Sequence, residues 1–144
     1  MLKIVKLKKN NINLEKLKFI YYLRNSNYVK KNSRNRNSFT YDNHVKWVNK
    51  NLIKKNKIFL IKKNNINIGY INVIKEKKRN YLSWTVKKTF QGRGYAKKAL
   101  IRIMKKEKNL FARIIYTNSK SIKLAKNCGM KKIRKYKEIL IFKL

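Results

Sequence analysis

The amino-acid sequence predicts an α/β (α+β) domain in which a central sheet of about seven strands is flanked by helices. Seven short segments are rich in β-branched and aromatic residues, and four longer segments have the pattern of helices. They follow one another in the order β-α-α-β-β-β-α-β-α-β-β. The 144 residues, of which 43% are hydrophobic, are enough for a single domain with its own core, spanning residues 1–144.

The N-terminal part predicts one strand, one helix and a long loop. Residues 2–7 form the strand, and residues 13–25 form an amphipathic helix with Asn13 as its N-cap. Its apolar face has i, i+3 and i+4 spacing and consists of Leu14, Leu17, Ile20 and Tyr21. Residues 25–40 are polar, rich in Asn and Ser, and show little periodicity. We expect them to form a loop of a length that often serves function.

A second helix and three strands follow. The helix covers residues 41–55, with Asp42 as its N-cap and a buried side of Val45, Val48 and Leu52. Residues 57–63 and 66–75 are two β-branched and aromatic runs joined by two asparagines, which predicts a β-hairpin. Residues 80–86 form the third strand of this group.

The C-terminal part alternates helices and strands before it closes with two strands. A helix is predicted from about residue 95 to 107, a strand over 110–116 and a helix over 119–128. The runs "KKIRKY" (131–136) and "EILIFKL" (138–144) form the closing pair of strands. We find neither an internal repeat nor a linker.

The net charge of +36 arises from 41 basic and only 5 acidic residues. Such a field attracts phosphates, nucleic acid or an anionic membrane surface. A- and T-rich codons for Lys, Asn and Ile are an alternative source of much of the charge, although they do not explain the scarcity of Glu. Lysine exceeds arginine and is spread over every element, with no RNP-like aromatic strand and no GXXG loop. We therefore expect a solvated surface without a specific nucleic-acid partner, and keep a basic nucleic-acid-binding module as an alternative.

Cysteine usage and hydropathy exclude several other classes. Cys128 is the single cysteine, so we expect neither a disulfide framework nor a CxxC metal site. The N-terminus alternates charged and apolar residues too early for a signal peptide. No apolar stretch approaches the roughly 20 residues that cross a bilayer. The sequence therefore predicts a soluble, cytoplasmic protein without a metal or a membrane partner.

Two of the four glycines lie in "QGRGYA" (91–96), between a predicted strand and a predicted helix. Without a Cβ, glycine allows a sharp turn and a close approach of a ligand to the backbone. The first turn of a helix adds unpaired N–H groups and partial positive charge. This combination predicts a cradle for a phosphate or pyrophosphate. The stretch lacks the Lys-Ser/Thr pair of a P-loop and the third glycine of a dinucleotide fingerprint.

The stretch resembles the Gln/Arg-x-x-Gly-x-Gly/Ala motif of the GNAT acetyltransferase superfamily. A second block, "NSKSIKLAKNCGMKK" (118–132), is similar to the family's Asn-x-x-Ser/Ala…Gly-Phe segment, with Met130 in place of Phe. The resemblance implies the GNAT fold with a mixed sheet, and acetyl-coenzyme A (acetyl-CoA) as co-substrate. The co-substrate would lie between two parallel strands, 80–86 and 110–116, that splay apart.

The same resemblance implies which residues bind the co-substrate. The backbone near Val86 would pair with the pantetheine arm like an added strand, and Asn118 would hold the other side of that arm. Gln91 and Ser121 occupy motif positions of the same site. The pyrophosphate would meet the N–H groups of Gly92, Arg93, Gly94, Tyr95 and Ala96.

The N-terminal half resembles a narrower group, the acetyltransferases of nucleotide-linked amino sugars on the route to pseudaminic-acid-type sialic acids. That group carries Arg-Asn, Val-Arg-x-x-Ser and His-x-x-Trp, which match segments 23–33 and 44–52 here. Leu23 stands where the group tends to have Trp, and Lys30 where it has Arg. The resemblance implies transfer to the 4-amino group of a UDP-linked amino-deoxy sugar. The substrate-binding residues would be Arg24, Asn25, Asn32, Ser33, His44 and Trp47.

The reaction needs a neutral amine, a stabilised oxyanion and a proton for the departing thiolate. His44, with an ordinary pKa of about 6.5, is the candidate base, and Ser83 could position a water. The usual tyrosine acid of the family corresponds to Ala125 here. Tyr116, Ser121 or water must then protonate the thiolate, or it leaves unassisted.

Other interpretations of these residues and of the acceptor stay open. Trp47 could be a core residue, Arg24 a helix cap and His44 a surface histidine. A protein N-terminus, as in ribosomal-protein acetyltransferases, is the alternative acceptor. A homodimer is compatible with the sequence.

Overall fold

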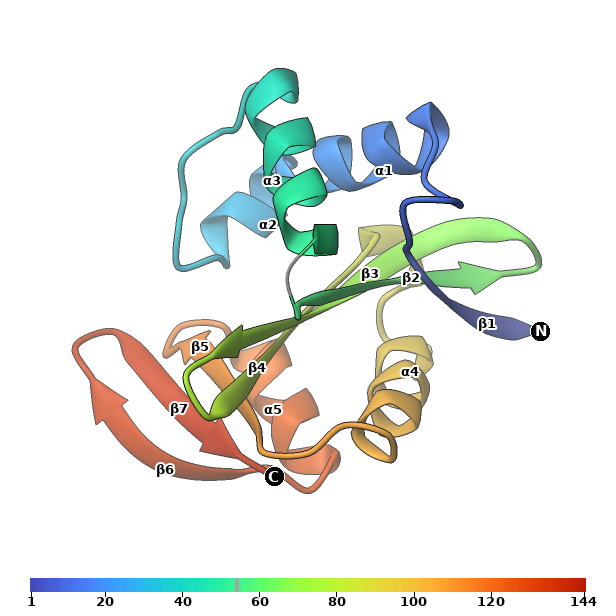
Figure 1. The fold of residues 1–144 in the computed structure, drawn as a ribbon. Coiled ribbons are helices and arrows are strands. Elements are labelled where there is room, and N and C mark those ends of the chain that lie inside the picture. Colours follow the sequence, from blue (N-terminus) through green and yellow to red (C-terminus); the bar gives the residue numbers. More distant parts are fainter. Residues whose placement is uncertain (54) are drawn as a thin grey trace.

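The computed structural model describes residues 1–53 and 55–144, and its centre is a seven-stranded sheet (Figure 1). The strand order is β1-β2-β3-β4-β5-β7-β6. Every neighbouring pair is antiparallel except β4 and β5, which are parallel, so the predicted mixed sheet is confirmed. The strands are β1 (Leu2–Lys6), β2 (Lys57–Lys63), β3 (Ile66–Glu76), β4 (Arg79–Val86), β5 (Leu110–Ile115), β6 (Lys131–Tyr136) and β7 (Ile139–Lys143).

The helices lie on both faces of this sheet. Figure 1 shows α1, α2 and α3 on one face and α4 and α5 on the other. The α helices are α1 (Leu14–Arg24), α2 (Asn27–Lys31), α3 (Tyr41–Ile53), α4 (Tyr95–Met104) and α5 (Ser119–Asn127), and a 3₁₀ turn, η1, covers Lys88–Phe90. None of the described helices has the length and apolarity that a membrane crossing requires.

Three apolar clusters hold the helices on the sheet. The core below α1–α3 includes the buried residues Ile20, Val48 and Tyr70. The core below α4 includes Leu82, Val86 and Leu100, whose side chains come from β4 and α4. A third cluster, around Ala125 and Phe142, packs α5 against β5 and β7. Strand β4 is therefore held by the clusters on the α4 and α5 face of the sheet.

Strands β4 and β5 separate along their length. Their pairing ends at Leu82↔Ala112, although β4 continues to Val86 and β5 to Ile115. The amide of Lys87 bonds the carbonyl of Ile68 on β3 at 2.7 Å. Because successive residues of a strand direct their amides to opposite edges, the amides of Trp84 and Val86 face the β5 side. The predicted splay between the two parallel strands is thus present.

Several sequence predictions of local structure are confirmed. The side chain of Asn13 accepts a hydrogen bond from the amide of Lys16 at 2.9 Å, as an N-cap does. Strands β2 and β3 form a hairpin, and Asn64 and Asn65 at its turn have φ of 49° and 66°. Two successive positive φ values are typical of a type I′ turn, which Asn tolerates well.

Three local predictions are wrong. Residues 25–40 are not entirely loop, because the buried side chain of Val29 anchors the short helix α2 against the core. Asp42 is not the N-cap of α3: Thr40 precedes the helix, and its hydroxyl accepts from the amide of Asn43 at 3.2 Å. Leu14 is 57% exposed, because the face of α1 that packs on the sheet is centred on Ile20 and Leu23.

Candidate functional site

The glycine stretch forms a turn whose backbone N–H groups are open to a ligand. Gly92 and Gly94 have φ of 74° and 77°, a left-handed conformation that favours glycine. A Cβ added at either position would meet nothing within 4 Å, so glycine is there for its backbone conformation. Gly94 is the N-cap of α4, no side chain caps this helix, and no described group accepts from the amides of residues 92–96. These features fit the pyrophosphate of acetyl-CoA.

The end of β4 is tied to the acceptor half of the protein. The carbonyl oxygen of Val86 accepts from the hydroxyl of Tyr28 at 2.7 Å and from Nε2 of Gln91 at 3.1 Å. A carbonyl oxygen has two lone pairs, and these two hydrogen bonds occupy both of them. The amide N–H of Val86 is therefore the backbone group that remains available to a ligand in the splay. Tyr28 belongs to α2, so this helix meets the strand along which we expect the pantetheine arm to lie.

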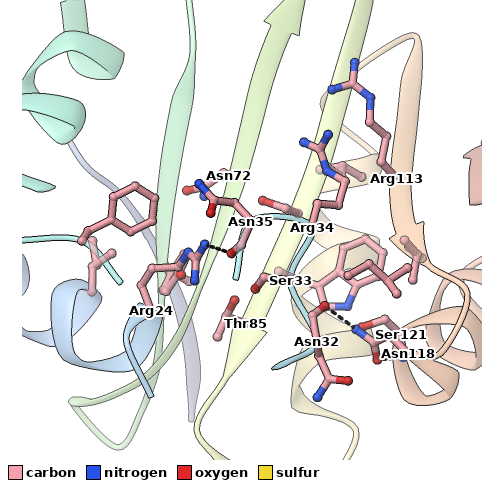
Figure 2. A pocket seen from close by; sticks show the side chains of 18 of the residues that line it. Arg24, Asn32, Ser33, Arg34, Asn35, Asn72, Thr85, Arg113, Asn118 and Ser121 are labelled. Carbon is pink, nitrogen blue, oxygen red and sulfur yellow. Dashed lines mark hydrogen bonds between the residues drawn. The ribbon is translucent and has the colours of Figure 1, made fainter. Parts of the chain in front are cut away.

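A cavity of about 510 Å³ opens where β4 and β5 separate, beneath α1 and α3 (Figure 2). Its lining includes both edges of the splay, the loop after α2 and the buried face of α3. The predicted residues that line it are Arg24, Asn32, Ser33, His44, Trp47, Ser83, Asn118 and Ser121. Residues from four helices and strands that are distant in sequence therefore converge on one space.

Three arginines line the cavity, and the described lining contains no carboxylate. Arg24 donates to the carbonyl of Asn35 at 2.5 Å, and its guanidinium lies 4.9 Å from the ring centre of Phe39. Its buried Nη1 atom has no hydrogen-bond partner among the described residues, and burial lowers the pKa of this guanidinium. The cavity therefore favours an anionic or electron-rich ligand.

His44 is buried in the wall of the cavity. It is only 4% exposed, and its Nε2 atom has no hydrogen-bond partner in the described part of the chain. Burial and, to a smaller degree, the positive charge of Arg24 lower its pKa to about 4. The ring is stacked on that of Trp47, with centroids 6.2 Å apart. The expectation of an ordinary pKa is thus wrong, and His44 is neutral at pH 7, a hydrogen-bonding group and a weak base.

Two of the residues predicted for catalysis or acceptor binding lie outside the cavity lining. The side-chain amide of Asn25 donates to the carbonyl of Phe39 at 3.0 Å and accepts from its amide at 2.9 Å, so it anchors the loop before α3. Tyr116 follows the end of β5, is 51% exposed, and has the Lys135 ammonium 5.3 Å from its ring centre. Asn118 lines the cavity but also caps α5 and donates to the carbonyl of Asn32 at 3.3 Å.

Sequence reasoning missed several residues at the site. Asn72 on β3 is buried, and its Oδ1 atom lacks a partner among the described residues. Arg113 on β5 lines the cavity and is bonded to Glu76. Both residues lie in strands, and the alternating pattern of a strand indicates only which side chains face the core. The one sequence signal for a role at the site was that a polar residue stands in a mainly apolar strand.

Comparison with known proteins identifies the class. Residues 11–131 match the family model of the acetyltransferase (GNAT) domain, and the chain therefore belongs to the GNAT acetyltransferase family. It is an acetyl-CoA-dependent N-acetyltransferase, and acetyl-CoA is its co-substrate. A search of curated proteins found no match.

Solved structures share the fold over the whole chain. A domain from Methanocaldococcus jannaschii superposes with a TM-score of 0.84 at 20% identity, covering 100% of this chain and 99% of that chain. The N-acetyltransferase PseH of Campylobacter jejuni, in complex with acetyl coenzyme A, has a TM-score of 0.74 at 18% identity, covering 100% and 98%. The ribosomal-protein-alanine N-acetyltransferase of Brucella melitensis has 0.77 at 14% identity, covering 100% and 98%. At such identities the likeness shows the fold alone.

Proposed function

We propose that this enzyme transfers the acetyl group of acetyl-CoA to the 4-amino group of a UDP-linked amino-deoxy sugar. The carrying observation is the cavity beside the splay, which three arginines line and no described carboxylate does. A diphosphate is attracted to such a space, whereas a polyamine is repelled by it. The similarity of segments 23–33 and 44–52 to nucleotide-sugar acetyltransferases supports the same acceptor class.

The proposal assigns binding of the co-substrate to the backbone. Acetyl-CoA supplies the thioester whose acetyl group is transferred. The amides of residues 92–96 hold its pyrophosphate at the start of α4. The N–H of Val86 holds the pantetheine arm, with Asn118 on the opposite edge of the splay and Gln91 fixing the Val86 carbonyl. The N–H of Trp84 faces the splay and can stabilise an oxyanion.

The proposal assigns the acceptor side to side chains. Ser83 on β4 is exposed in the cavity and positions the water that removes a proton from the amine. Neutral His44 orients the acceptor through its Nε2 atom, since its lowered pKa makes it a weak base. Ser121 also lines the cavity and donates a hydrogen bond to the departing thiolate. Tyr116 does not line the cavity and is not assigned this role. Arg24, Asn32, Ser33 and Trp47 form the remaining walls, and Asn25 holds the loop.

The decisive experiment compares acceptors by following the release of free coenzyme A thiol. A UDP-4-amino-4,6-dideoxy sugar is tested against peptides with free N-termini at equal concentration, with a polyamine as a cationic control. We expect turnover of the sugar and little of the other two. Robust turnover of peptides without the sugar would replace this proposal with acetylation of protein N-termini. The folded Ser83→Ala variant controls for uncatalysed transfer and should turn over more slowly.

A further inference from the structure

Two arginines at one end of the cavity form a cationic pair with a single carboxylate. Arg113 is bonded to Glu76 through both terminal guanidinium nitrogens, with Nη1 and Oε1 3.1 Å apart, and its guanidinium stacks 3.5 Å from the ring centre of Tyr81. The guanidinium of Arg34 has no hydrogen-bond partner within residues 1–53 and 55–144. Figure 2 shows both side chains extending the same way, at the end away from Asn118 and Ser121.

The charge balance of this pair favours an anion. Glu76 can neutralise one of the two guanidinium groups, so one positive charge remains uncompensated. Two like charges that line the same end of one cavity repel each other. Burial lowers the pKa of Arg34, and the positive charge of Arg113 lowers it further. An anion placed between them would relieve this repulsion and accept hydrogen bonds from the free fork of Arg34.

The choice of arginine also distinguishes this end of the cavity. Only eight of the 41 basic residues of the chain are arginines, and three of the eight line this one cavity. Arginine presents a planar fork that matches phosphate oxygens, whereas lysine offers a point charge. Most basic residues of this chain are lysines, so a cluster of arginines indicates a site where the planar guanidinium group binds a ligand.

We propose that Arg34 and Arg113 form a diphosphate subsite that holds the acceptor by its phosphates, with the amine directed toward Asn118 and Ser121. The identity of the acceptor rests on the proposed function. Tyr81, beside Arg113, precedes Ser83 by two residues on β4, about 7 Å along the strand. One sugar ring then lies between the phosphates and the reacting amine. Arg24 forms the side wall and is already bonded to the Asn35 carbonyl.

The subsite is tested by binding of inorganic pyrophosphate and UDP, with uridine as the probe that lacks phosphate. The variants are Arg34→Ala and Arg113→Lys, which keeps a cation beside Glu76 but removes the fork. Arg36→Ala is the matched control, because Arg36 is exposed in the same loop and does not line the cavity. Calorimetry at constant salt should show about tenfold weaker pyrophosphate and UDP binding for Arg34→Ala and Arg113→Lys. Arg36→Ala should change binding less than twofold, and uridine binding should not change.

The outcomes separate this inference from the proposed acceptor. Equal loss of pyrophosphate binding in Arg34→Ala and Arg36→Ala would overturn the subsite, because it would mean diffuse attraction to a charged surface. Acetylation of the UDP-amino sugar with an unchanged KM in Arg34→Ala would also overturn it, while the proposed function stood. Arginine-dependent pyrophosphate and UDP binding without acetylation of that sugar would support the subsite and reject the proposed acceptor.

Discussion

The two substrate sides of this enzyme are built from different parts of the polypeptide. On the co-substrate side most of the proposed contacts are backbone amides within one stretch, residues 86–96, shaped by two glycines with positive φ, and Asn118 adds a side chain. On the acceptor side the proposed contacts are side chains from α1, the loop after α2, α3, β4 and β5, which line the cavity. A site made of backbone tolerates most side-chain changes, whereas a site made of dispersed side chains changes with each of them. This difference teaches why the reaction class is easier to infer than the acceptor.

The largest expected effect separates backbone from side chain within the glycine stretch. Gly94→Val places a β-branched residue at φ 77° and directs its side chain toward the proposed phosphate. Loss of about two charge-assisted hydrogen bonds, roughly 3 kcal/mol, should weaken acetyl-CoA binding about a hundredfold. Calorimetry on the folded variant measures this effect.

The neighbouring position provides the control. Arg93→Ala removes a charged side chain but leaves the backbone N–H in place, so acetyl-CoA affinity should fall only severalfold. If Arg93→Ala proved as damaging as Gly94→Val, the side chain would carry the binding, and the contrast between the two substrate sides would be lost.

The fold could be predicted from the sequence because its elements depend on local patterns. Alternating β-branched residues located the strands, and Asn64-Asn65 located the hairpin turn. The short helix α2 was missed because it depends on the burial of Val29 against residues far away in sequence. The cap of α3 was misplaced by two residues because Thr40 and Asp42 are both good capping residues.

The site was predictable where short sequence motifs mark its residues. The glycine stretch carries its own chemistry, but Arg113 and Asn72 join the cavity only after the strands pair. The pKa of His44 could not be predicted either, because it depends on burial and on Arg24 from another helix. Ala125 is fully buried between β5 and β7 side chains, so packing occupies the space around the family's tyrosine position.

A second expected effect concerns the acceptor side at acidic pH. The pKa of His44 is about 4 in the folded protein and about 6.5 when unfolded, so protonation favours the unfolded state. The stability that neutral His44 contributes is fully present above pH 6.5 and is lost as the pH falls toward 4. At pH 5 the loss of unfolding free energy amounts to about 2 kcal/mol. His44→Gln should lose less stability between pH 7 and pH 5 than the wild type does, by denaturant unfolding. Parallel losses in both proteins would contradict the lowered pKa.

A third effect tests whether the two substrate sides are independent. Arg24→Ala removes a cation from the cavity wall while leaving the glycine stretch untouched. The KM for the UDP-amino sugar should rise roughly tenfold, and acetyl-CoA affinity should not change. Steady-state kinetics and calorimetry give the two values. A matching loss of acetyl-CoA affinity would indicate that Arg24 also organises the co-substrate side.

The smallest expected effect concerns the bond that joins the two sides. The Tyr28 hydroxyl donates to the Val86 carbonyl at 2.7 Å, which links α2 to the end of β4. Tyr28→Phe keeps the ring in the core and removes one hydrogen bond, about 1 kcal/mol. Because Val86 belongs to the co-substrate side and α2 leads into the acceptor loop, both the acetyl-CoA Kd and the acceptor KM should rise, by about two- to fivefold. Tyr22→Phe, at a position 66% exposed, is the control and should change neither value. A rise in one value alone would show that Tyr28 serves a single substrate and that the two sides act separately.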